Sequence, residues 1–129
     1  MANVLGIGGV FFKSKDTETI AQWYKTWLGF EIEPSFGGSV FFPANLPEGA
    51  YTVWSPFKAD TDYFEPSANT YMINLIVDDV AAALAQVKEG GAALVGEPES
   101  YEYGDFGWFM DPDGNKVELW KPAAEMPIS

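Results

Sequence analysis

The sequence predicts one domain of the α+β class, residues 1–129, built from two modules that each run strand, helix and then three strands. Two stretches of apolar residues at helical spacing each end at glycine, and each has strand-like runs before and after it. The residues that flank the two helices also repeat, because an offset of 62 residues pairs Asp16 with Asp78 and Gly29 with Gly91. A chain of 129 residues is long enough for one hydrophobic core and too short for a second independent domain of ordinary size.

The first half shows this order of elements clearly. β-branched and aromatic residues predict a strand at about 5–13, and the helical spacing that follows predicts a helix over about 17–28. Asp16 or Thr17 can cap the helix, and Gly29 can end it. We expect three strands after the helix, at about residues 30–33, 38–43 and 50–57.

The second half repeats the plan. A strand is expected at 71–77, with Asp78 and Asp79 as the helix cap and Gly90 and Gly91 as the stop. The stripe of apolar residues on this helix consists of Val80, Leu84 and Val87. Three further strands should follow. The modules are expected at about residues 4–57 and 71–122, with a linker at about 58–70.

Composition excludes several classes of function. The chain contains no Cys and no His, so disulfides, thiolate zinc sites and imidazole chemistry are excluded. Seven lysines and no arginine face nineteen carboxylates, giving a net charge of −12. Nucleic acids and anionic membrane surfaces are therefore unlikely partners. The acidity serves either solubility alone or a preference for cationic or neutral small ligands.

The sequence also predicts a cytoplasmic location. No apolar run approaches the roughly 18–20 residues that a membrane span needs, and the N-terminus lacks the pattern of a signal peptide.

Three segments resemble a known group of proteins: GIGGVFFKSKDTETIAQWYKTWLGFEIEP, MINLIVDDVAAALAQVKEGG and YGDFGWFMDPDGNKVELWKP. Together they resemble the vicinal oxygen chelate superfamily, which includes glyoxalase I, bleomycin-resistance proteins and extradiol dioxygenases. The most specific feature is DPDGN followed by a strand that contains Glu118. The resemblance implies a curved mixed sheet around a cleft, helices on its outer face, and a homodimer whose second subunit commonly completes the cleft.

The resemblance also implies four metal-ligand positions, which fall on Gly9, Val53 or its neighbour, Met72 or Tyr71, and Glu118. Among these positions only Glu118 offers a good donor. One carboxylate cannot replace the water shell of zinc, nickel or iron, and a second copy of the chain would add no histidine. We therefore expect no bound metal and no cofactor.

Two polar residues on predicted strands are candidate catalytic groups. Glu118 alternates with Val117 and Leu119, so it faces the cleft if these two face the helices. There it could act as a general base, or it could only bond a neighbouring tyrosine or backbone amide. Asn74 lies among apolar residues and needs hydrogen-bond partners, either from the protein or from a ligand.

Aromatic residues form the second candidate group. Gly104 and Gly107 interrupt an aromatic run that has acidic neighbours, a setting that suits a flat or cationic organic ligand. The alternative is that these are ordinary strand aromatics. The candidate ligand-binding residues are Trp54, Phe57, Tyr101, Tyr103, Phe106 and Trp108.

Two functions remain open. The chain could be a bleomycin-resistance-like protein that binds a small organic ligand in an acidic, aromatic cleft without a metal. It could instead be a glyoxalase-like lyase or isomerase in which Glu118 moves a proton while Asn74 and tyrosine hydroxyls hold an oxyanion. Binding is favoured, because an enzyme without metal, Arg or His has few groups to stabilise negative charge.

Overall fold

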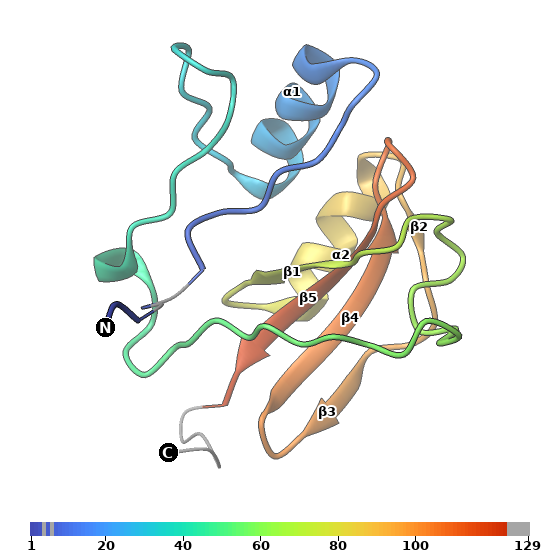
Figure 1. Ribbon diagram of the computed structural model, residues 1–129. Helices are drawn as coiled ribbons and strands as arrows, with labels where there is room; N and C mark the ends of the chain where they lie inside the picture. The colour runs from blue at the N-terminus through green and yellow to red at the C-terminus, as the bar shows by residue number, and fades with distance from the viewer. Residues whose placement is uncertain (4, 6, 124–129) are drawn as a thin grey trace.

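The computed structural model describes residues 1–3, 5 and 7–123, and it consists of two helices and an open mixed sheet (Figure 1). The sheet order is β1-β5-β4-β2, with β3 paired to β4; β1 runs parallel to β5 and the other pairs are antiparallel. The elements are α1 (Thr17–Leu28), η1 (Pro43–Asn45), β1 (Ile73–Ile76), α2 (Val80–Glu89), β2 (Ala93–Leu94), β3 (Glu99–Tyr101), β4 (Gly104–Met110) and β5 (Lys116–Pro122).

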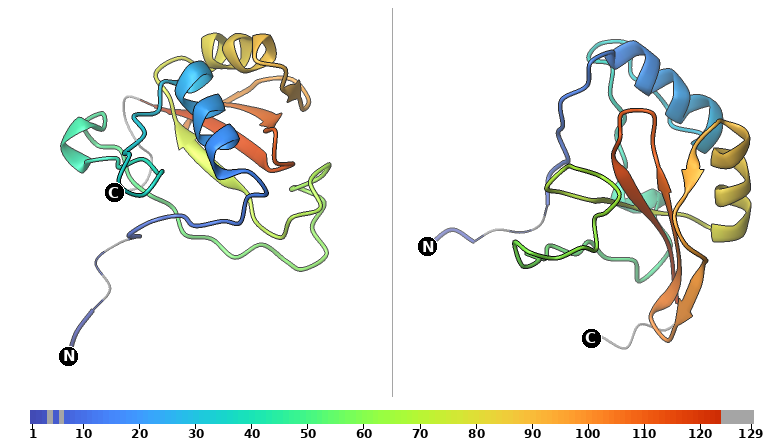
Figure 2. Two further views of the ribbon diagram at one scale, coloured as in Figure 1. Left: turned by 90° about the horizontal axis from the view of Figure 1, so that it is seen from above. Right: turned by 90° about the vertical axis from the view of Figure 1, so that its right-hand side faces the viewer.

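Both helices pack on one face of the sheet, and the chain before β1 crosses the other face (Figure 2). The core lies between helices and sheet. Its fully buried side chains include Val87 of α2, Phe109 of β4, and Val117 and Leu119 of β5. The α+β class and the helices on one outer face are as predicted from the sequence.

The two helices begin and end where the sequence predicts. Asp16 accepts a hydrogen bond from the backbone N–H of Thr19 at 3.1 Å, and Asp79 accepts one from that of Ala82 at 3.0 Å. These bonds satisfy backbone donors that the first helical turn leaves free. Gly29 ends α1 with a φ of 70°, a backbone conformation that favours glycine.

The strands expected in the first half differ from the structure. Among the described residues before Ile73, α1 and the short η1 are the regular elements, and the segments at about 5–13, 30–33, 38–43 and 50–57 form no strand. A strand exists only through hydrogen bonds to a neighbour, and these segments have no such neighbour within one copy of the chain. Their local β propensity is therefore not realised in the monomer.

Neither helix described by the structure is long and apolar enough to cross a membrane.

Candidate functional site

The predicted polar residues lie side by side on the sheet face opposite the helices. Glu118 of β5 pairs in register with Asn74 of β1 on one side and with Trp108 of β4 on the other. Side chains alternate along each strand, so Val117 and Leu119 enter the core while Glu118 faces away from it. The register thus aligns Asn74, Glu118 and Trp108 across three strands.

Glu118 accepts hydrogen bonds from three side chains. Asn74 Nδ2 donates to Oε1 at 2.7 Å, while Trp108 Nε1 and the Tyr63 hydroxyl donate to Oε2 at 2.8 and 2.6 Å. The carboxylate is buried, since Glu118 is only 9% exposed. Charge-assisted bonds of this kind are short and strong, so the carboxylate is held rigidly in one position.

Tyr63 comes from the linker and brings Lys116 into the same site. Lys116 Nζ donates to the backbone carbonyl of Tyr63 and lies 4.9 Å from the centre of its ring. Burial lowers the pKa of Lys116, while Glu118 and Asp62 oppose this shift. Burial raises the pKa of the Tyr63 hydroxyl, and its bond to Glu118 raises that pKa further. Tyr63 is therefore a hydrogen-bond donor at neutral pH.

An aromatic cluster continues the same face toward β3. Phe106 stacks on Trp120 with ring centres 6.1 Å apart and planes 8° apart. Tyr101 and Tyr103 stack on each other at 5.3 Å, and both pack edge-on against Phe106. Three predicted ligand-binding residues, Tyr101, Tyr103 and Phe106, thus form one cluster. It lies next to the Glu118 row, which is the aligned set of Asn74, Glu118 and Trp108.

The remaining predicted aromatic residues divide between the site and the solvent. Trp108 is buried in the Glu118 row, and Phe57 stacks on Tyr63 with ring centres 5.6 Å apart. Trp54 is 76% exposed and belongs to neither aromatic group. Within one copy of the chain, Trp54 is therefore not brought to Glu118.

The side chains around Glu118 do not fit a divalent metal. Its three neighbours direct N–H or O–H hydrogens at the carboxylate, so they act as donors toward it and not as additional ligands. The side chain of β1 that meets Glu118 is Asn74, while the Tyr71 hydroxyl bonds Asn115. Across the part of the chain that the structure describes, no group of three or more Asp or Glu residues could hold a metal ion.

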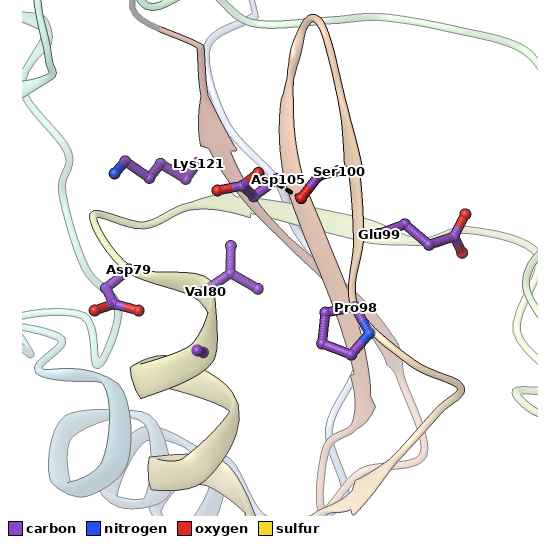
Figure 3. Close-up of a pocket in the computed structure, with 8 residues that line it drawn as sticks. Asp79, Val80, Pro98, Glu99, Ser100, Asp105 and Lys121 are labelled. Atoms are coloured by element: carbon purple, nitrogen blue, oxygen red, sulfur yellow. Dashed lines mark hydrogen bonds between the residues drawn. The ribbon is translucent and has the colours of Figure 1, made fainter.

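Two surface hollows lie away from Glu118. One, of about 310 Å³, lies between the N-terminus of α2 and β3 (Figure 3). It is lined in part by Asp79, Lys121 and the hydrogen-bonded pair Ser100 and Asp105. The other, of about 570 Å³, lies beside the β4–β5 hairpin and includes Asp113 among its lining residues.

Sequence reasoning missed two residues of the site for different reasons. The alternation that places Glu118 also places Lys116 and Trp120 on its face, so Lys116 could have been found from strand parity. Tyr63 lies in a linker without periodicity, where no pattern indicates which residue will reach the sheet.

Comparisons with known proteins give a consistent result. Residues 9–120 match the family model described as a glyoxalase-like domain. A hypothetical protein from S. aureus is 28% identical, with a TM-score of 0.50, covering 84% of this chain and 89% of that one. TnmS3, an antibiotic binding protein from Streptomyces sp. CB03234, is 26% identical with a TM-score of 0.50, covering 84% and 88%.

A member of the glyoxalase/bleomycin resistance protein/dioxygenase superfamily from Sphaerobacter thermophilus is also similar. It is 26% identical with a TM-score of 0.49, covering 84% of this chain and 90% of that one. No curated protein matches the chain significantly.

Proposed function

The chain belongs to the glyoxalase-like domain family, and from this premise we propose that it binds a small, flat organic ligand, neutral or cationic, without a metal. The ligand lies on the sheet face formed by Glu118, Trp108 and the cluster around Phe106. The protein acts in the cytoplasm, as the sequence predicts. The similarity to a Streptomyces protein described as antibiotic binding supports a binding role.

The observation that carries the proposal is a buried, rigid carboxylate next to aromatic rings. Glu118 uses three of its roughly four acceptor positions on Asn74, Trp108 and Tyr63, which leaves one for a ligand donor. Phe106, which stacks on the buried Trp120 and is itself only partly buried, offers aromatic surface beside it. Stacking and cation–π contacts there are each worth about 0.5–2 kcal/mol.

A lyase or isomerase that uses Glu118 as acid or base is the alternative. In this structure Asn74 Nδ2 and the Tyr63 hydroxyl both donate to Glu118 and are not free to hold an oxyanion. An enzyme would have to release these donors before they could stabilise negative charge on a substrate. The hydrogen-bond pattern therefore favours binding.

The experiment is a thermal-shift screen with flat neutral and cationic aromatic compounds. A ligand that binds only the folded chain adds about 2.7 kcal/mol of stability at a hundredfold excess over Kd. Glu118→Gln should weaken binding of the hits, because it removes the charge. If Glu118→Gln binds a hit normally and only loses its conversion, the enzyme alternative is correct. If no compound shifts the melting temperature, the proposal is wrong.

We further propose that two copies of the chain form a homodimer that completes the site. Large apolar side chains of the first half are exposed in one copy, where they would normally be covered. The segments that hold them read as strands in the sequence but have no strand neighbour, and a second copy can supply one. These exposed residues include Phe11, Phe36, Val40, Phe42, Val53 and Trp54.

A further inference from the structure

Tyr63 makes three different contacts at the candidate site. Its hydroxyl donates to Glu118, its backbone carbonyl accepts from Lys116, and its ring packs edge-on against Trp108 with centres 6.4 Å apart. The hydroxyl of Tyr63 thus meets the carboxylate of Glu118, its carbonyl oxygen meets the ammonium of Lys116, and its ring meets the indole of Trp108. The site is complementary to a tyrosine.

No sheet or helix hydrogen bond holds Tyr63 in place, because the linker is tied to the β4–β5 hairpin further along the chain, at Ser67 and Asn69. Tyr63 lies in a turn of the linker, outside every helix and strand, and is 37% exposed. If it left, Glu118 would lose one of its three donors and Lys116 would lose its carbonyl acceptor. Water would reach both charged groups in the vacated space, so the ligand that binds best there is one that restores both charge-assisted bonds and adds ring contacts of its own.

We propose, on the basis of the function proposed above, that Tyr63 occupies the ligand's own position and that the ligand is a phenol with a carbonyl oxygen. The ligand's hydroxyl donates to Glu118, its carbonyl accepts from Lys116, and its ring packs against Trp108. This narrows the ligand class from flat organic compounds in general to hydroxyaryl compounds with a carbonyl group.

Tyr63 competes with the ligand, so the affinity of the wild-type chain is reduced by the fraction of molecules in which Tyr63 is in place. A hydrogen bond to a charged group contributes enough to change affinity about tenfold or more. Removing Tyr63 should therefore strengthen binding, whereas removing a residue that only contacts the ligand would weaken it.

The test uses N-acetyl-L-tyrosinamide as the probe and N-acetyl-L-phenylalaninamide as its matched partner without the hydroxyl. Affinities are measured by calorimetry on the wild type, Tyr63→Ala and Tyr63→Phe. We expect Tyr63→Ala to bind the tyrosine probe at least about tenfold more tightly than the wild type, and the phenylalanine probe more weakly than the tyrosine probe. Adding Lys116→Met to Tyr63→Ala should remove most of the gain.

Equal affinity of folded Tyr63→Ala and wild type would overturn the inference, as would equal binding of the two probes. If Tyr63→Ala does not fold, Tyr63→Phe decides, because it retains the ring and frees only the acceptor on Glu118. An unchanged affinity of Tyr63→Phe for the tyrosine probe would then overturn it. Should the probes fail while other aromatic compounds bind in a Glu118-dependent way, this inference is wrong and the proposed binding function stands.

Discussion

Asp111 accepts four hydrogen bonds at the turn between β4 and β5. Its Oδ1 receives the backbone N–H groups of Asp113 and Asn115, and its Oδ2 receives Asn115 Nδ2 and the Tyr24 hydroxyl. The residue is 5% exposed. One carboxylate therefore shapes the hairpin that begins β5 and joins it to α1.

We predict that Asp111→Ala lowers the free energy of unfolding by about 3 kcal/mol, because it leaves several buried donors without an acceptor. Asp113→Ala is the matched control. Its Oδ2 is buried and has no partner among the described residues, so this change should cost less than about 0.5 kcal/mol. Urea denaturation measures both values. Equal losses would show that the network around Asp111 does not stabilise the hairpin.

Tyr24 gives the fold a predictable dependence on high pH. Burial raises the pKa of its hydroxyl, and the neighbouring Asp111 raises it further. The folded-state pKa thus lies above the unfolded value of about 10, so this contribution is complete below about pH 10 and is lost above it. At pH 11 the loss from Tyr24 should be about 1.4 kcal/mol.

Tyr24→Phe provides the comparison for this pH effect. Between pH 9 and 11, urea denaturation should show a smaller loss of stability for Tyr24→Phe than for the wild type, because phenylalanine cannot ionise in the unfolded chain. The same loss in both proteins would contradict the assignment.

Strand parity is the reason that part of the site could be predicted at the level of single residues. Glu118, Asn74 and Trp108 were expected on strands, and register alone brings them together. Tyr63 reaches Glu118 through a linker conformation that depends on tertiary contacts, which a periodic pattern does not encode. Local periodicity thus locates residues on regular elements and leaves linker residues undetermined.

At the scale of elements, α2 approaches the sheet closely at Gly107. A Cβ added there would lie 2.8 Å from Leu84 Cδ1 and 3.0 Å from Val80 Cγ1. We predict that Gly107→Ala destabilises the fold by about 1–3 kcal/mol, since the packed side chains of Leu84 and Val80 must shift to accept the methyl group. Gly8→Ala is the control, because a Cβ there meets nothing within 4 Å. Thermal unfolding that changes equally in both variants would contradict this packing.

The elements divide into those determined locally and those determined by pairing. The helices were predicted within a residue or two, because caps, apolar spacing and glycine stops are all local signals. The segments at about 38–43 and 50–57 have local strand signals as well, yet they form no strand in one copy. Strand formation requires a partner, and sequence periodicity does not identify it.

At the scale of the whole molecule, we predict a homodimer. Light scattering at low micromolar concentration should give twice the 14.2 kDa mass of the chain. Phe11 is 94% exposed in one copy, so Phe11→Asp should shift the chain toward monomer if that surface lies in the interface. A wild-type monomer at this concentration would refute the dimer.

Ligand binding on the face of Glu118 can be measured directly through the five tryptophans of the chain. Each indole N–H gives its own signal in a ¹⁵N–¹H NMR spectrum. Trp108 Nε1 donates to Glu118, whereas Trp23 Nε1 donates to the carbonyl of Gly90 on the helical side. Titration with an aromatic hit should move the Trp108 signal and leave that of Trp23 in place; movement of Trp23 with an unchanged Trp108 would contradict the account.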